Sequence, residues 1–338
     1  MKSVHLVIPD LFLPEDIAAE VCAGLRLPAL EKMLGRGAST ARTDVSGLSL
    51  ENLLCELFEV QCHPDAPIAP ISAAFDKLAA GCWLRADPVH LRLQRDQILL
   101  LPNKEISADE AETLCASLNV HFAGQGMEFF APHPQRWYVR TDTQPCICTT
   151  PLSQVIGRNV RGALPTGEDA SRWHQVFNEI QMLLFAHPLN DAREARSALP
   201  VNSVWLWGGG CNPVSPMKKS YNRASSDEVL VEMFAAEAGV HFAVWSKQFI
   251  DAEGRQLLVW TGLRSALQSG DLAAWRAALQ DFETGYAAPL WQALRAGKIA
   301  SLRLDILAED SIRSVFVTRG DIWKFWRRTK RLAEYLMV

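Results

Sequence analysis

The sequence of 338 residues has no apolar run of about 18 residues, so it predicts no helix that spans a membrane. No internal repeat or low-complexity segment is present, which excludes a repeat architecture. The first residues carry one Lys and then an apolar stretch with Pro and Asp, unlike a signal peptide. A net charge of −4 offers no excess positive charge, so nucleic acid is an unlikely main partner.

The composition is that of an ordinary globular protein, with 49% hydrophobic and 21% charged residues. A chain of this length can bury a large core, and two domains are expected. Eight scattered cysteines include one close pair, Cys146 and Cys148, without the second pair that a zinc site needs. We therefore expect reduced thiols, a cytoplasmic location and no membrane partner.

The hydrophobic pattern predicts an α/β core that carries an α+β insertion. Within 65–197, two strands, a helix and two more strands follow one another, an order typical of an α+β domain. Pro64–Pro70 suits an extended crossing into that domain, and Asn190–Pro200 would be the return crossing. The core is then expected to comprise 1–64 and 198–338.

The core is expected to hold a mainly parallel sheet, because its strands alternate with helices. Strands 4–10 and 203–207 would be parallel neighbours in that sheet. Apolar residues at intervals of three and four predict an amphipathic helix over 322–336. Five basic residues in this stretch are more typical of a solvated helix face than of a contact with nucleic acid or lipid. They are Lys324, Arg327, Arg328, Lys330 and Arg331.

The most informative segment extends from His187 to Gly210. It opens with His-Pro-Leu-Asn-Asp-Ala-Arg, enters an apolar strand after Asn202, and ends on three consecutive glycines. We expect Gly208, Gly209 and Gly210 to form a sharp turn or to approach a ligand closely, where a Cβ would clash. Their spacing matches neither dinucleotide nor P-loop motifs, so the phosphate signal is weak and a structural role stays open.

This segment resembles a stretch of archaeal-type cofactor-independent phosphoglycerate mutases, which belong to the alkaline phosphatase superfamily. Val4–Pro9 followed by Asp10 is similar to the superfamily's first strand and first metal ligand, and Leu27–Gly37 to its next helix. Ile68–Val89 resembles the start of the mutases' inserted domain. The chain as a whole resembles the RpfE-type bacterial proteins still more closely. The resemblance covers most of 1–240 and implies an alkaline-phosphatase-like core.

The resemblance also implies a phosphoryl-transfer centre with two divalent metals and a Ser or Thr nucleophile. Asp10 stands at the first ligand position, and Thr43, Ser46 or Ser49 lies near the nucleophile's position. A simpler interpretation also stays open, in which Asp10 caps a helix or loop and Ser46 is a loop residue.

The C-terminal histidine ligands of that centre are missing. No histidine follows His241, and Ile322 stands after Gly320-Asp321 where a histidine is expected. Carboxylates alone are poor substitutes for imidazole at a paired Mn²⁺ or Zn²⁺ site. We therefore expect no bound metal and no cofactor, with Mn²⁺ or Mg²⁺ only if the chain is an active enzyme after all.

In the mutases the inserted domain supplies arginines that grip the substrate. By resemblance, Arg136 and Arg193 would grip an anionic ligand, since a guanidinium makes paired hydrogen bonds to oxyanions. Asn190 and Asn202 would orient the ligand beside His187 and the glycines. Alternatively, each arginine forms an ordinary ion pair and His187 caps the C-terminal end of a helix.

The preferred hypothesis is a phosphoglycerate-mutase-like protein with a degenerate metal centre. It would be a non-catalytic, regulatory binder of a small phosphorylated or carboxylated molecule. One alternative is an active 2,3-bisphosphoglycerate-independent phosphoglycerate mutase or a phosphohydrolase. Another is a protein-interaction module without a small ligand, which would need an exposed apolar patch. The sequence does not indicate an oligomeric state.

Overall fold

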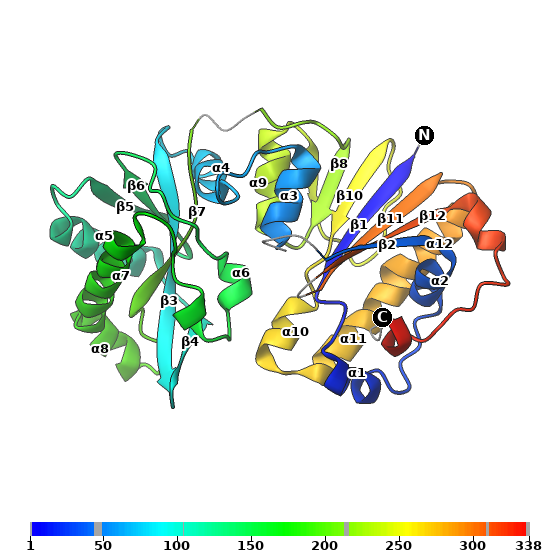
Figure 1. The fold of residues 1–338 in the computed structure, drawn as a ribbon, viewed down its shortest axis with the longest axis horizontal. Helices are drawn as coiled ribbons and strands as arrows, with labels where there is room; N and C mark the ends of the chain where they lie inside the picture. The colour runs from blue at the N-terminus through cyan, green and yellow to red at the C-terminus, as the bar shows by residue number, and fades with distance from the viewer. Residues whose placement is uncertain (1, 44–48, 104, 213–215, 309–310, 336–338) are drawn as a thin grey trace. The chain divides into compact units, whose positions relative to one another are not determined.

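The computed structural model divides into two compact units (Figure 1). The first unit comprises Met1–Phe58 and Met217–Val338, and the second comprises Glu59–Pro216. The sequence predicts an insertion over 65–197, whereas the second compact unit spans Glu59–Pro216. The residues described are 2–43, 49–103, 105–212, 216–308 and 311–335.

The first unit is built on a seven-stranded sheet in the order β2-β12-β11-β1-β10-β8-β9. The five strands from β11 to β9 are parallel, and β12 and β2 continue the sheet antiparallel. The predicted mainly parallel core sheet is thus confirmed. The strands are β1 Ser3–Pro9, β2 Ala38–Arg42, β8 Arg223–Ser226, β9 His241–Val244, β10 Arg255–Val259, β11 Ser301–Leu307 and β12 Ile312–Thr318.

Helices cover both faces of this sheet, which is why β1 is almost entirely apolar. On one face, Leu6 and Ile8 pack with α1, α2, α10, α11 and α12 in a single core cluster. On the other face, Phe58 of α3 packs against Phe234 of α9. The helices are α1 Glu15–Val21, α2 Pro28–Arg36, α3 Leu50–Phe58, α9 Val229–Glu237, α10 Arg264–Ser269, α11 Leu272–Phe282 and α12 Ala288–Arg295.

The second unit is an antiparallel sheet in the order β4-β3-β6-β5, with β7 also paired to β3. One face packs on α5 and α7 through residues such as Leu84 and Val204, and the other face meets α4 through Trp83. The strands are β3 Cys82–Gln94, β4 Gln97–Pro102, β5 Met127–His133, β6 Arg136–Thr141 and β7 Ser203–Cys211. The helices are α4 Ile68–Phe75, α5 Ala108–His121, α6 Leu152–Val155, α7 Ala170–Phe185 and α8 Pro188–Ala195.

The prediction that 203–207 and 4–10 are parallel neighbours is wrong. β7 lies in the sheet of the second unit and pairs antiparallel with β3, whereas β1 lies in the first unit. The apolar run that suggested a core strand is explained by burial on both faces, since Trp205 and Leu206 are both buried. The same strand contains Gly208–Gly210, so the predicted turn there is also wrong.

Two of the eight cysteines form a disulfide, which corrects the expectation of reduced thiols throughout. Cys82 and Cys211 are bonded across β3 and β7, where they are direct partners in the strand register. They are 129 residues apart in sequence, so no local spacing signal marks them as a pair. The bond joins the first residue of β3 to the last residue of β7.

The predicted helix over 322–336 does not form in the described residues, which end at 335. Two short 3-10 turns occur there, Arg319–Trp323 and Leu332–Tyr335, with irregular backbone between them. The apolar spacing has a partial explanation, because Ile322 and Leu332 are both buried. Between these anchors, Arg327 donates to the backbone carbonyls of Arg36 and Gly37, a tertiary contact that a local helical pattern does not reveal.

A row of buried, hydrogen-bonded polar side chains links β1 to β11 in the central sheet. His5 lies 2.7 Å through Nδ1 from the Tyr221 hydroxyl and 2.7 Å through Nε2 from Oδ2 of Asp305. Arg303 Nε donates to the same carboxylate at 3.0 Å. Burial alone would raise the pKa of Asp305, but the hydrogen bond and charge of His5, with hydrogen bonds from Arg303 and Ser314, lower that pKa to about 2.

This pKa predicts a specific loss of stability in acid. The folded pKa of Asp305 lies below the unfolded value, so its stabilisation is complete above about pH 4 and is lost as the pH falls towards 2. The loss is about 2 kcal/mol of unfolding free energy. Urea unfolding between pH 7 and pH 2 should show a flatter acid decline for Asp305→Asn than for the wild type. The exposed control Asp281→Asn should leave the decline unchanged, and equal declines for all three proteins would contradict the assignment.

Candidate functional site

The carboxyl ends of the parallel strands carry a group of charged side chains in the first unit. This edge is where open α/β sheets bind ligands. Asp10 follows β1 directly and adopts a left-handed backbone conformation, with φ of 62°. Asp227 and Glu228 follow β8, and Arg264 begins α10 shortly after β10. The fold therefore brings together one cation and several carboxylates from three neighbouring strand ends.

Arg264 holds the centre of this group. Its Nε donates to Oδ2 of Asp10 at 3.2 Å, and its Nη1 lies 3.9 Å from Oε2 of Glu228. Burial alone would lower the pKa of Arg264, but the negative charges of Asp10, Glu51 and Glu228 raise it above the ordinary value. The guanidinium thus supplies the positive charge that these carboxylates require.

The other carboxylates at this edge also make backbone contacts. Glu228 is the N-cap of α9 and accepts a hydrogen bond from the Leu230 N–H, and Asp227 accepts one from the Thr261 N–H at 2.8 Å. Burial raises the pKa of both, although their hydrogen bonds and the Arg264 charge oppose that rise. Neither Glu228 nor Arg264 belongs to a motif that the sequence analysis connected with a site.

These residues do not fit a two-metal centre. Across the described part of the chain, no group of three or more His, Cys, Asp or Glu side chains is arranged to hold a metal ion. Ser46 lies outside the described residues, and Ser49 is a buried residue whose hydroxyl accepts from the Asn52 N–H. Asp321 closes a capping box with Thr318, so this remnant of a metal motif has a structural role.

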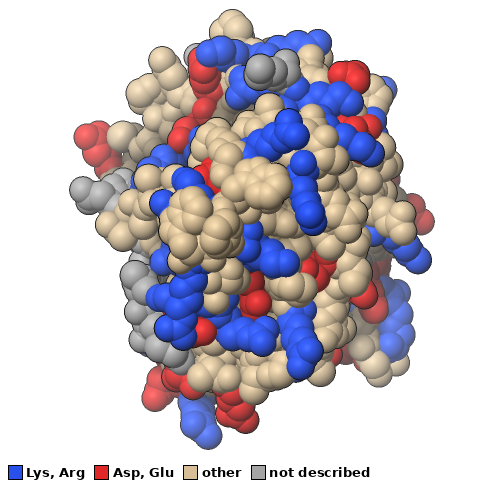
Figure 2. Space-filling model, turned by 90° about the vertical axis from the view of Figure 1, so that its right-hand side faces the viewer, with Lys and Arg blue, Asp and Glu red and all other residues tan. Residues whose placement is uncertain are grey.

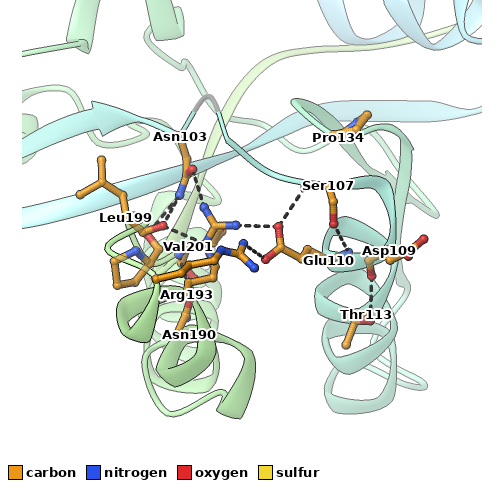
Figure 3. Close-up of polar contacts among 12 residues, drawn as sticks. Asn103, Ser107, Asp109, Glu110, Thr113, Pro134, Asn190, Arg193, Leu199 and Val201 are labelled. Carbon is orange, nitrogen blue, oxygen red and sulfur yellow. Dashed lines mark hydrogen bonds and ion pairs between the residues drawn. The ribbon is translucent and has the colours of Figure 1, made fainter.

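Arg193 was predicted to grip a ligand, but it is completely buried within the second unit (Figure 3). Its Nη1 donates to Glu110 at 2.7 Å, its Nη2 to Asn103 Oδ1 at 2.9 Å, and its Nε to the Leu199 carbonyl at 2.9 Å. Each guanidinium nitrogen is therefore hydrogen-bonded to the protein itself. The structure gives Arg193 a role in holding the fold, with no nitrogen left to face a ligand.

Three neighbouring polar residues of the predicted site likewise form hydrogen bonds within the protein. Asn190 donates to the carbonyls of Leu184 and Val201 and accepts from the Val201 N–H. Asn202 donates to the Leu91 carbonyl and accepts from the Leu91 N–H, in the manner of a ladder pair. His187 is the N-cap of α8, not the C-terminal cap considered from the sequence.

Arg136 pairs with a carboxylate of its own unit. Its Nε and Nη2 donate to the two oxygens of Asp76 at 3.0 and 2.7 Å, and the Tyr138 hydroxyl donates to Oδ2 at 2.6 Å. Burial alone would raise the pKa of Asp76, but these hydrogen bonds and the Arg136 charge hold it below the ordinary value. This bidentate pair corresponds to the ion-pair alternative for Arg136.

The three glycines do permit a close approach, but the approaching group belongs to the protein. A Cβ added to Gly208 would lie 3.0 Å from Ile68, and one added to Gly210 would lie 2.8 Å from Pro67. A Cβ on Gly209 would meet Leu84 at 2.7 Å. The glycines let α4 and the chain before it pack directly on β7, and this contact explains them without a ligand.

Replacing Arg193 tests whether it is structural. Arg193→Ala leaves the buried Glu110 carboxylate without its main partner and should lower the unfolding free energy by about 3–5 kcal/mol. Arg196 contacts the same carboxylate, but its side chain is 54% exposed, so Arg196→Ala should cost about 0–1 kcal/mol. Urea unfolding of both variants measures the difference. Equal, small effects would show that Arg193 is free for another role.

No protein-family model matches the chain. Relatives found by sequence are phosphoglycerate mutases. The 2,3-bisphosphoglycerate-independent phosphoglycerate mutase of Methanosarcina mazei is 28% identical over 200 residues, which are 56% of this chain and 49% of the relative. A probable enzyme of the same name from Geobacter sulfurreducens is 36% identical over 198 residues, 56% of this chain and 50% of the relative. The chain thus matches about half the length of these relatives.

A solved structure supports the fold. The PH0037 protein from Pyrococcus horikoshii matches with a TM-score of 0.55 at 13% identity, covering 99% of this chain and 92% of that chain. The strand–helix alternation wrongly placed β7 beside β1 in the core sheet, but the sequence relatives support the resemblance independently. The chain therefore has the predicted alkaline-phosphatase-like α/β fold with an inserted α+β unit, and it is similar to the cofactor-independent phosphoglycerate mutases.

Proposed function

We propose that this chain is a phosphoglycerate-mutase-like protein that does not transfer phosphoryl groups and acts as a regulatory binding protein. The observation that carries the proposal is the position of Arg264 beside Asp10 and Glu228. By resemblance, Asp10 stands where the superfamily places its first metal ligand. The Arg264 guanidinium pairs with the Asp10 carboxylate and offsets part of the negative charge that would attract a divalent cation.

A guanidinium cannot replace the chemistry of two metals. Paired ions activate the nucleophile and neutralise the phosphoryl group in flight, and both tasks need open coordination positions that a guanidinium lacks. The absence of histidine after His241 supports the same proposal, since imidazole is a preferred ligand for Mn²⁺ and Zn²⁺. The proposed protein works without a resident metal or other cofactor.

The contacts within the second unit limit which residues could bind a small anion. Arg136, Arg193, Asn190 and Asn202 are engaged by groups of the protein itself, so a small phosphorylated or carboxylated ligand would have to use other residues. We keep a small phosphorylated or carboxylated molecule as the proposed ligand, held by residues other than these four. From the resemblance, we further propose an RpfE-type bacterial protein of the cytoplasm.

Metal content and activity test the proposal directly. Purified protein incubated with Mn²⁺ or Zn²⁺ and then desalted should retain no stoichiometric pair of ions by elemental analysis. It should also fail to interconvert 2- and 3-phosphoglycerate in a coupled assay with either metal. Two tightly bound ions per chain, or metal-dependent mutase turnover, would favour the active-enzyme alternative.

A second experiment tests Arg264 as the resident cation. Arg264→Met leaves its carboxylate neighbours without their counter-charge and should lower the unfolding free energy by about 1–3 kcal/mol, less than for a fully buried pair because the side chain is 20% exposed. Millimolar Mg²⁺ or Mn²⁺ should raise the Tm of this variant but not of the wild type. Arg26→Met, an exposed arginine just before α2, is the matched control and should show neither effect. A divalent-ion response in the wild type would argue against the proposal.

A further inference from the structure

A solvent-exposed aromatic cluster lies near the C-terminal end of the described chain. We define the basic aromatic loop as Trp323–Arg331. Three of its rings are mostly exposed: Trp323 at 65%, Phe325 at 78% and Trp326 at 69%. Large aromatic side chains normally dominate cores and interfaces, so three exposed rings within four residues mark an interaction surface.

The same loop is strongly basic. Five of its nine residues are Lys or Arg and none is acidic, although the whole chain has a net charge of −4. Lys324 pairs with Asp321, and Arg331 lies 3.5 Å from Glu31. Arg328 and Lys330 make no ion pair within the described residues. Figure 2 shows Lys and Arg side chains gathered over this side of the molecule.

The loop is fixed in position by contacts on its inner side. Buried Ile322 and Leu332 anchor its two ends. Arg327 donates to the Arg36 and Gly37 carbonyls at 3.0 Å, and the Lys330 N–H donates to the Tyr335 hydroxyl at 3.1 Å. The backbone is therefore held against the end of α2 while the rings face solvent.

We propose that the basic aromatic loop docks this protein on the surface of an anionic phospholipid bilayer. Trp rings favour the headgroup level of a bilayer, and Lys and Arg beside them attract acidic headgroups. Such a contact is peripheral. Among the described helices, none is long and apolar enough to cross a membrane. The sequence alone favoured a solvated helix face, but the observed loop contains no α-helix and leaves its rings uncovered.

The ring geometry favours lipid over single-stranded nucleic acid. Phe325 and Trp326 pack edge to face, with ring centroids 5.4 Å apart and an interplanar angle of 78°. Successive bases stack on aromatic faces within a groove that follows the strand. Two nearly perpendicular rings on an exposed loop do not provide parallel faces for neighbouring bases. Insertion into a headgroup layer requires only apolar edges next to cations.

Vesicle flotation tests the proposal with the full chain. Vesicles of phosphatidylcholine with 30% phosphatidylserine should bind at least tenfold more protein than vesicles of phosphatidylcholine alone. Binding should fall steeply between 50 and 500 mM NaCl, because salt screens exposed charges. Equal binding to both vesicles, or no binding to either, would overturn the proposal.

Paired variants locate the contact on the loop. The ring pair Trp323→Ala with Trp326→Ala and the charge pair Arg328→Gln with Lys330→Gln should each lower binding to anionic vesicles at least fivefold. The controls lie in the other unit: Met182→Ala with Phe185→Ala removes exposed apolar side chains, and Arg92→Gln with Arg95→Gln removes exposed charge.

Both control pairs should bind within twofold of the wild type, and circular dichroism should confirm that all variants fold. Loss of binding in the controls as much as in the loop variants would overturn the assignment. So would loop-dependent binding to a poly(U) oligonucleotide without loop-dependent binding to vesicles. The metal and mutase assays do not involve this loop, so the lipid proposal can fail or succeed whatever those assays show.

Discussion

The second unit depends on the burial of one guanidinium. A charge removed from water must be paired and hydrogen-bonded, or the surrounding structure cannot tolerate it. Arg193 satisfies this requirement by joining α8 to Glu110 of α5, to Asn103 after β4 and to the carbonyl of Leu199 before β7. Four separate parts of the unit must therefore take their native positions together.

The first unit follows the same rule with different residues. His5 and Asp305 pair inside the central sheet, and Arg264 forms an ion pair with Asp10 at the strand ends. In each case an ionised group sits where its partner comes from a distant part of the chain. Buried polar groups of this kind specify a unique arrangement when every member is satisfied. The charged and polar side chains that had been candidates for a functional site therefore stabilise the fold instead.

Local patterns predicted the fold class well, because they report periodicity and caps. The capping box of Ser107 and Glu110, which begins α5, and the Asp271 cap of α11 are local features of this kind. Local patterns did not predict which strands and side chains contact one another across long sequence separations. A strand buried on both faces looks the same in either sheet, which is why β7 was misplaced. A ligand-binding arginine and a buried structural one also share one sequence signature, since Glu110 lies 83 residues from Arg193.

The central place of β1 has a consequence for synthesis. β1 lies between β10 and β11, and both of these strands come after the whole inserted unit in the chain. During translation, β1 is complete long before either neighbouring strand is made. Its apolar residues and His5 therefore lack their sheet partners during that time. The inserted unit has no such delay, because its strands are made in one continuous stretch. The insertion can therefore fold first, and the surrounding unit closes only after β11 is made.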